Sequence, residues 1–497
     1  MFHPSRTLAH QRNDSDVTIA PLRRPKSNAL LHYSLYDFPI VLQDSTYLAG
    51  VDLQAWCTTI GGCLAVMATF GYTNAFGVYQ DVYTRSGAAS AFRISWIGST
   101  QMFFMLAMAL PAGKLLDMGY FRQATLFGSV LYVFSLFMVS IAHTDQYYQI
   151  FLAQGLGMGI GAGFLYVPAI AVQARHWQDR KALAMGAVTV GSSLGSIFFP
   201  IMLNQLFEKP SVGFGWGVRA SAFVVLGLLI LANLLMSDRR PDDFAEKPKA
   251  IPDFKGIMTD VPYLLCVLAS FFINLGLFFP YFYIQLFAVL HNIDNNIAFY
   301  FLAILSAASL PGRLLPNILA DRVGPFNVIV PIICIAGALI FAMFGIGSGS
   351  SATVGGITAF SIFYGFFSGA FISLCPACLA VLSRTPDEVG VRFGIAYFLA
   401  GFGVLFGTPI DGRLLGDLHT NTNTNPNAGT GASAIPNPNG GGNGNNTTSS
   451  AGHIVPAIPS LEWSKAIVFS GVTVLVGSVF LLGIRMMLAR RKGTRLV

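Results

Sequence analysis

The sequence predicts an all-α membrane protein with twelve transmembrane helices arranged in two bundles of six. Twelve apolar stretches of roughly 20 residues run along the chain, and a helix needs about that length to cross the hydrocarbon core of a bilayer. Hydrophobic residues make up 54% of the 497 residues, and charged residues make up only 11%. A polar segment at 237–260 separates the stretches into two groups of six.

The expected spans follow the apolar stretches in chain order: 55–78, 92–112, 123–142, 147–172, 182–206, 216–236, 261–287, 297–317, 326–346, 353–379, 389–410 and 463–488. They divide the chain into an N-terminal bundle (51–236), a cytosolic linker (237–260) and a C-terminal bundle (261–488). Residues 1–50 contain no cleavable signal peptide and read as a mostly disordered cytosolic arm. Residues 413–460, rich in Asn, Gly and Thr, predict a disordered outer loop, and 489–497 a cytosolic tail.

The distribution of positive charge predicts the orientation. Most of the 30 Lys and Arg residues fall in the tails and alternate loops that share a side with the N-terminus. This positive-inside bias places both termini in the cytosol. The net charge of +7 therefore reflects membrane orientation, and no nucleic-acid partner is expected. Asn445 and Asn446 begin overlapping glycosylation sequons in the outer loop, which agrees with this topology. We expect an integral, multi-pass protein, in the plasma membrane rather than the vacuolar membrane.

All six cysteines fall inside expected spans, where a thiol acts mainly as a small apolar group. Cys375 and Cys378 have the spacing of a redox or metal-binding pair, but no other Cys or His lies nearby in sequence. We therefore expect packing roles and no disulfide framework.

The two halves of the chain repeat each other. Asp117 lies at the cytosolic end of the second span, and Asp321 lies at the matching end of the eighth. The fifth and eleventh spans carry glycines and a proline at matching positions: Gly186, Gly195 and Pro200 in the first half, and Gly394, Gly403 and Pro409 in the second. Related halves of this kind are typical of secondary transporters, whose substrate site lies between the repeats.

Several motifs resemble those of the major facilitator superfamily, and more narrowly the fungal branch of the monocarboxylate-transporter family, which includes riboflavin-transporter-like members. They are the Asp-centred loops at Asp117 and Asp321 and the runs 71–80, 95–99, 180–195 and 364–371. The resemblance covers about 52–488. It implies the major facilitator fold and a secondary transporter that moves an organic solute by alternating access.

The sequence lacks the motifs that ATP hydrolysis, metal binding and nucleophilic catalysis require. No Gly-x-x-x-x-Gly-Lys-Ser/Thr loop, no metal-spaced His/Cys cluster and no nucleophile elbow occurs. We expect no enzyme activity, no cofactor and no metal site. The expected partners are a small organic solute and membrane lipid, and a monomer is compatible with the sequence.

Arg313 is the candidate for contact with a charged substrate. It lies eight residues before Asp321, about 12 Å along a helix, and therefore well inside the eighth span. A guanidinium stays charged and can bind a carboxylate with two hydrogen bonds. Alternatively, Arg313 extends toward the cytosol and braces the Asp321 loop. The resemblance implies the substrate role, because the family's substrate-contacting arginine aligns with Arg313.

Two departures from the family change the expected substrate. Ser309 stands where proton-coupled lactate-type members carry an Asp, and Asn74 stands where they carry a Lys. The carboxylates, among them Asp411, map to span ends or loops. We therefore expect weak dependence on a proton gradient, and a larger organic anion or an aromatic, uncharged or zwitterionic solute.

Other candidates for the substrate pocket share helix faces near the middle of the spans. They are Phe70 and Asn74 in the first span, Asn274 and Tyr281 in the seventh, and Tyr364 and Ser368 in the tenth. Helix–helix hydrogen bonds are the alternative role for the polar members, and plain packing is the alternative for Phe70.

Asp117 and Asp321, with the neighbouring Arg122 and Arg322, are candidates for a gate at the cytosolic end. Charge pairs there could close the cytosolic side and break when it opens. Capping of a helix N-terminus is the alternative role for the two carboxylates. Two alternative functions also stay open: a nutrient sensor on a transporter scaffold, and an efflux carrier for a secondary metabolite.

Overall fold

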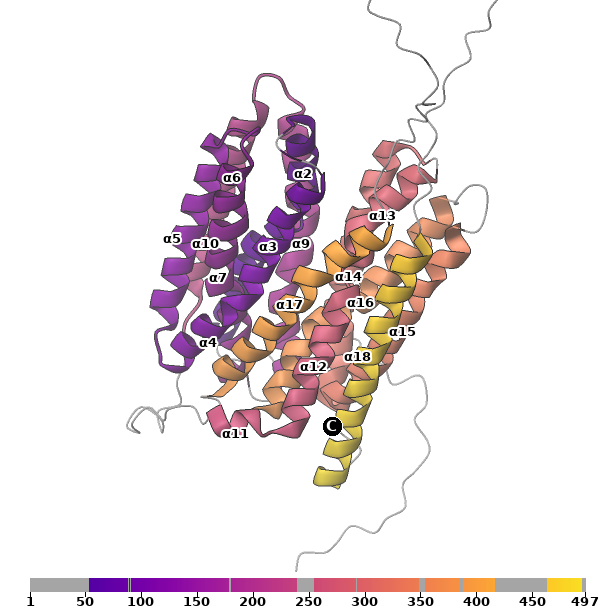
Figure 1. Ribbon diagram of the computed structural model, residues 1–497. Helices are drawn as coiled ribbons and strands as arrows, with labels where there is room; N and C mark the ends of the chain where they lie inside the picture. Colours follow the sequence, from indigo (N-terminus) through magenta and orange to yellow (C-terminus); the bar gives the residue numbers. More distant parts are fainter. Residues whose placement is uncertain are drawn as a thin grey trace, which may run out of the picture. The chain divides into compact units, whose positions relative to one another are not determined.

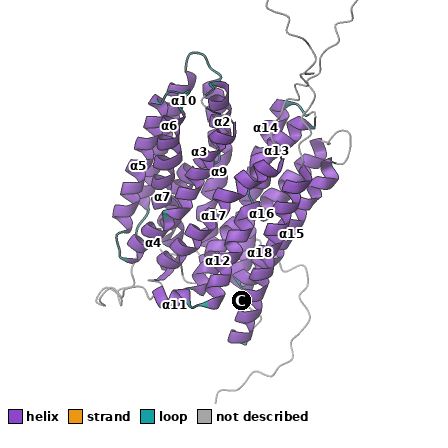
Figure 2. Ribbon diagram, in the orientation of Figure 1, coloured by secondary structure: helices purple, strands orange, loops and turns teal. Residues whose placement is uncertain are grey.

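The structure is a computed structural model that describes residues 53–87, 89, 91–177, 180–238, 254–291, 293–347, 354–384, 388–415 and 463–493. Every regular element in these ranges is a helix (Figure 2). Twelve of the helical stretches are long and apolar enough to cross a membrane, which confirms the expected number of spans. The expected arm 1–50, most of the linker, the outer loop beyond 415, Asn445 and Asn446 lie outside the described residues.

Six spans make up the first half of the chain. The first span consists of α1 (Leu53–Val66), η1 (Met67–Gly71) and α2 (Phe76–Arg85), the second of α3 (Ala91–Ala107) and α4 (Ala109–Asp117), and the fourth of α6 (Tyr147–Ile150), η2 (Phe151–Met158), α7 (Gly159–Ala171) and α8 (Gln173–His176). The third, fifth and sixth spans are single helices: α5 (Phe121–Ile141), α9 (Lys181–Phe207) and α10 (Gly213–Leu235).

The second half begins with the short helix α11 (Phe254–Met258) and continues with six further spans. Their bounds are α12 (Val261–Gly276) and α13 (Phe279–Leu290), α14 (Asn295–Val323), α15 (Pro325–Gly347), α16 (Val354–Leu382), α17 (Val389–Leu415) and α18 (Trp463–Lys492). The seventh span breaks between α12 and α13, where Pro280 stands in the first turn of α13. Proline fits that position because the first N–H groups of a helix have no partner within the helix.

The outward faces of the bundles are apolar. Val130 and Phe134 of α5 and Phe223 and Leu234 of α10 are large, exposed hydrophobic side chains. In water such a surface would be unfavourable, whereas in a bilayer it contacts lipid tails of similar polarity. These faces agree with a protein that is embedded in a membrane along the length of its helices.

The two halves of the chain contact each other mainly along α17 and α14 of the second half, with a smaller contact between α16 and α9. The helix α17 packs against α3 and α4, and α14 packs against α9. Figure 1 shows α4, α11 and the beginning of α17 at the same end of the molecule.

Candidate functional site

The carboxylate of Asp321, near the end of α14, caps a helix of the other half. Its Oδ1 accepts a hydrogen bond from the backbone N–H of Ala182, and its Oδ2 accepts one from Leu183, both at 2.9 Å. These N–H groups belong to the first turn of α9 and have no partner within that helix. A negative charge is also favourable at this position because of the helix dipole.

Asp117, at the end of α4, makes the equivalent contact in the opposite direction. Its carboxylate accepts hydrogen bonds from the N–H of Gly390 at 3.1 Å and of Val391 at 2.7 Å, in the first turn of α17. Each half of the chain therefore caps a helix of the other half. We call these two contacts the latches, and the end of the molecule that carries them the latch end.

The Asp117 latch also contains an ion pair. The guanidinium of Arg175 on α8 lies 3.2 Å from the Asp117 carboxylate and 2.7 Å from that of Asp238. Within the part of the chain that the structure describes, Asp321 forms no comparable ion pair. The two latches share one geometry, but the Asp117 latch has the larger electrostatic component.

The cations that we expected beside the two aspartates lie elsewhere. Arg122 and Arg322 are exposed, and Asp117 forms its ion pair with Arg175 instead. Arg175 was missed because it comes 58 residues after Asp117, at the end of a different span. Asp117 and Asp321 both cap helix N-termini, which was the alternative role considered for them. The capped helices belong to the opposite half of the chain and are not the helices that follow each aspartate in sequence.

Arg313 lies at the contact between α14 and α9. Its side chain is 3% exposed, and its Nη1 donates a hydrogen bond to the carbonyl oxygen of Thr189 at 3.1 Å. One turn away, the hydroxyls of Ser193 and Ser309 form a hydrogen bond of 2.6 Å between the same two helices. The buried Nε of Arg313 has no hydrogen-bond partner among the described residues. Arg313 therefore connects the two halves and retains one free donor.

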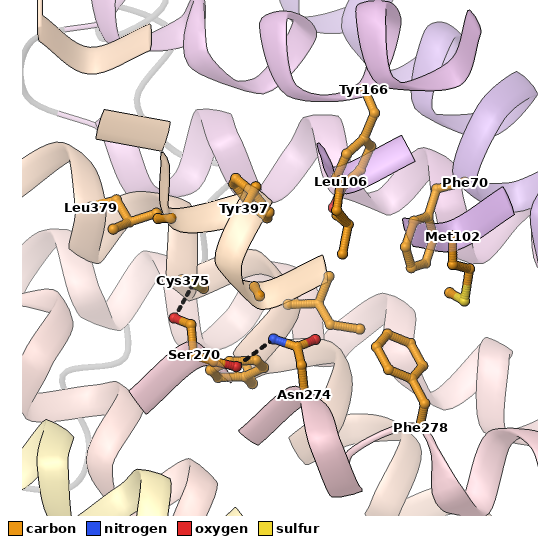
Figure 3. Close-up of a pocket in the computed structure, with 14 residues that line it drawn as sticks. Phe70, Met102, Leu106, Tyr166, Ser270, Asn274, Phe278, Cys375, Leu379 and Tyr397 are labelled. Atoms are coloured by element: carbon orange, nitrogen blue, oxygen red, sulfur yellow. Dashed lines mark hydrogen bonds between the residues drawn. The ribbon is translucent and has the colours of Figure 1, made fainter. Parts of the chain in front are cut away.

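A pocket lies between the two halves (Figure 3). Phe70, Met102, Leu106 and Tyr166 of the first half line one side. The second half contributes the other walls, which are lined by Ser270, Asn274, Phe278, Phe371, Ile372, Cys375, Leu379, Ala396, Tyr397 and Ala400. Both halves must contribute for the pocket to be complete.

The pocket is aromatic and contains neutral polar groups only. The rings of Phe70 and Tyr166 stack with centroids 5.4 Å apart, and Tyr397 meets Tyr166 edge to face. Asn274 donates from Nδ2 to the carbonyl oxygen of Ser270 at 2.8 Å, which leaves its amide oxygen available. Tyr397 has a buried hydroxyl without a hydrogen-bond partner in the described ranges. Such a surface suits a flat, apolar molecule with a few hydrogen-bonding groups.

Phe70 and Asn274 are the sequence candidates that line this pocket. The other candidates are not among its lining residues and have partners within the protein. Asn74 donates to Ser196 at 2.7 Å, Tyr281 and Ser368 share a hydrogen bond of 3.1 Å, and Tyr364 donates to the carbonyl oxygen of Leu277 at 2.6 Å.

Two buried charged residues were not recognised in the sequence. Arg392, in the first turn of α17, is fully buried, and it pairs with Asp260 at 3.0 Å and with Glu388 at 3.2 Å. Asp411 lies in the last turn of α17, near a span end as expected, but it is only 1% exposed and is therefore a buried carboxyl group that was not recognised in the sequence. A span boundary predicted at residue 410 excluded it, whereas α17 extends to Leu415.

The structure is that of a membrane carrier. It has twelve spans in two halves, reciprocal contacts between the halves at one end, and a pocket between them. The family description "Major Facilitator Superfamily" matches residues 58–413. The chain belongs to the Major Facilitator Superfamily, and it is a transporter of that superfamily. The broad resemblance seen in the sequence is therefore confirmed.

Similar curated proteins are fungal transporters. The MFS-type transporter dbaD of Emericella nidulans is 38% identical over 372 residues, which cover 74% of this chain and 80% of that protein. The agnestins efflux protein AgnL12 of Paecilomyces divaricatus is 39% identical, over 73% of this chain and 81% of its own length. The aspyridones efflux protein apdF of Emericella nidulans is 37% identical, over 73% of this chain and 72% of its own length.

Solved structures share the fold at low sequence identity. The Escherichia coli transporter FucP in its outward conformation matches with a TM-score of 0.58 and 13% identity, over 86% of this chain and 98% of that one. An outward-facing bacterial homologue of the iron transporter ferroportin matches with a TM-score of 0.59 and 14% identity, over 87% of this chain and 99% of that one.

Proposed function

We propose that this transporter exports a neutral, aromatic organic molecule by alternating access, across the plasma membrane. The observation that carries the proposal is the pocket between the halves, in which aromatic side chains from both halves face neutral polar groups. The names of two relatives, which state efflux of agnestins and of aspyridones, support the direction of transport.

In this proposal the latches are the gate of the cycle. While Asp117 and Asp321 cap α17 and α9, the latch end stays closed and the pocket is separated from that side. Release of both carboxylates exposes four backbone N–H groups to water, so the change between states exchanges one set of hydrogen bonds for another. A difference of a few kcal/mol between two such states is enough for a ligand to shift their populations.

A second candidate is the export of an organic anion, which fits the narrower likeness to monocarboxylate transporters. The unpartnered Nε of Arg313 favours it, because a buried guanidinium with a free donor is suited to an oxyanion. Arg313 is not among the residues that line the pocket, however, and its Nη1 is already bound to Thr189. We therefore favour the neutral substrate.

Transport by the purified chain in proteoliposomes tests the proposal. A panel should pair neutral aromatic compounds with carboxylated counterparts of the same ring system, and the measured quantity is the exchange of labelled compound across the membrane. We expect exchange of at least one neutral compound, and a loss of exchange in Tyr166→Ala. The lipid-facing Phe134→Ala is the matched control, since it removes an exposed ring far from the pocket.

Two results would contradict the proposal. Exchange of the carboxylated compounds alone would support the organic anion and the role of Arg313. Binding of a compound without any exchange would support the sensor alternative.

A further inference from the structure

Asp411 is a buried carboxyl group that has no role in the proposed gate or in the pocket. It is a carboxyl group that is 1% exposed in α17, one turn before the helix ends at Leu415. Its Oδ1 accepts a hydrogen bond from the hydroxyl of Ser470 on α18 at 2.8 Å. Its Oδ2 is buried, and no described residue is hydrogen-bonded to it.

The groups that face Asp411 are neutral. The titratable ones are the phenols of Tyr283 on α13 and Tyr364 on α16, and α18 contributes the Ser470 hydroxyl. The cation nearest to Asp411 along α17, Arg413, and the cation nearest to Ser470 along α18, Lys465, have exposed side chains. No ion pair of Asp411 occurs in the described part of the chain, where Ser470 is its recorded partner.

An unpaired charge and an unsatisfied oxygen are unfavourable in these surroundings. A buried carboxylate is normally paired with a cation or satisfied by several donors, and inside a membrane such residues mark ion and proton paths. A proton on Oδ2 removes the charge and leaves Oδ1 free to accept from Ser470. The site is also close to the end of α17 opposite the latch end, about 6 Å along the helix, so a proton from that side has a short path.

Asp411 lies beside the break in the seventh span. Tyr283 of α13 donates to the carbonyl oxygen of Thr408 at 3.2 Å, and its hydroxyl lies 2.9 Å from where a Cβ on Gly412 would be. Gly276, the last residue of α12, packs against the backbone of Ser470. Figure 1 shows the end of α17 beside α13 and α18.

This arrangement connects Asp411 to the pocket. Ser470 contacts both the Asp411 carboxyl group and Gly276, and Phe278 lies two residues beyond Gly276 and lines the pocket. A hydroxyl binds a charged carboxylate more strongly than a neutral carboxylic acid. A change in the protonation of Asp411 therefore changes the contact that holds α18 against the break between α12 and α13.

We propose that Asp411 is a proton-binding site that couples the protonation of the C-terminal half to the movement of α13 during transport. The proposal rests on the proposed function only for its link to substrate movement. Proton binding itself forms one O–H bond at Oδ2 and needs no other reactant.

Infrared difference spectra of the full chain in lipid nanodiscs test the proton site without any substrate. Spectra between acid and alkaline buffer should contain a carboxylic-acid C=O band that titrates with pH and is lost in Asp411→Asn. The asparagine keeps an acceptor for Ser470, so the variant is expected to fold. In Ser470→Ala the band should persist at a shifted frequency, because the carboxyl group loses its recorded partner. Glu208→Gln, which alters an exposed carboxylate at the end of α9, is the matched control and should keep the band.

Proteoliposomes with an imposed pH gradient test the coupling, using the neutral compound that the exchange assay identifies. The gradient should drive accumulation by the wild type, in contrast to the weak dependence expected from the sequence, in which Asp411 was not recognised as buried. In Asp411→Asn, accumulation should fall to the level without a gradient while exchange at equal pH persists, and Asp411→Glu should restore part of the accumulation. An unchanged carboxylic-acid band in Asp411→Asn, or unchanged gradient-driven accumulation, would overturn the proposal. Failure of the proposed function would differ, because the wild type itself would then show no exchange.

Discussion

Gly113 of α4 and Gly390 of α17 lie backbone against backbone, so a Cβ on either residue would overlap the carbonyl group of the other. Gly390 is also the residue whose N–H is capped by Asp117, and a Cβ on it would lie 2.6 Å from the Asp117 carboxylate. The close approach of the two backbones is thus what brings the carboxylate within reach of the first turn of α17. Steric fit and electrostatics at this latch depend on the same glycine.

We therefore predict that Gly390→Ala shifts the protein away from the conformation with a closed latch end. The added methyl group must push backbone atoms apart, and overpacking of this kind costs about 1–3 kcal/mol. Spin labels at the exposed positions Arg122 and Arg384, with Cys334 replaced by Ser, would report the separation of the halves at the latch end. The distance distribution should gain a longer component. Gly227→Ala, where a Cβ meets no atom within 4 Å, should leave the distribution unchanged.

The two latches should differ in strength. Asp117→Asn removes a charge from the N-terminus of α17 and also breaks the ion pair with Arg175. Asp321→Asn removes the charge at α9, which is attracted by Arg180 but forms no ion pair in the described residues. Loss of a favourable charge at a helix N-terminus is worth about 0.3–1 kcal/mol, and up to ~2 kcal/mol where it is partly buried. Measured with the same spin labels, the long-distance component should be larger in Asp117→Asn. Equal populations in the two variants would show that the ion pair with Arg175 does not stabilise the latch.

Arg392 should be important for stability rather than for substrate recognition. It is fully buried, pairs with Asp260 and Glu388, and stacks on the ring of Tyr263 at 5.0 Å. Removal of one partner from a buried ion pair costs about 3–5 kcal/mol, because the remaining charges lose their compensation. We expect the Arg392→Met variant in detergent to unfold at a clearly lower temperature than the wild type, with unfolding monitored by size-exclusion chromatography. Arg413→Met, which removes an exposed arginine from the other end of the same helix, should unfold at the wild-type temperature.

The number of spans and the repeat of Asp117 and Asp321 were predictable because hydropathy and internal repetition are properties of local sequence. The partners of these aspartates were not, since the N–H of Val391 lies 274 residues from Asp117. The same limitation applies to Arg313, whose hydrogen bond crosses to Thr189 of the other half. Hydropathy also gives poor span boundaries when a charged residue lies near a helix end. For this reason Asp411 was assigned to a span end, and the burial that tertiary packing imposes on it and on Arg392 was not recognised.

Arg313→Met distinguishes the two roles that the sequence left open for this residue. The hydrogen bond between Nη1 and the Thr189 carbonyl joins α14 to α9, so its loss should weaken the contact between the halves. We expect the variant to reduce the exchange of neutral and carboxylated aromatic compounds by the same factor, roughly 3–10-fold for one lost hydrogen bond. A selective loss for carboxylated compounds would instead establish Arg313 as an anion-binding residue.

Tyr397 provides the most direct test of the pocket. Its hydroxyl is buried without a partner in the described ranges, while its ring lines the pocket and packs edge to face on Tyr166. Tyr397→Phe keeps the ring and removes only the hydroxyl, so the fold should be unaffected. A substrate that bonds to this hydroxyl should lose about 0.5–1.5 kcal/mol of binding free energy, equivalent to roughly a 3–10-fold rise in KM for exchange. Tyr132→Phe is the matched control, because the hydroxyl of Tyr132 is also buried and unpartnered in the described structure but lies on α5, outside the pocket. A raised KM in Tyr397→Phe alone would locate the substrate between the two halves, whereas equal effects of both substitutions would show that the substrate binds elsewhere.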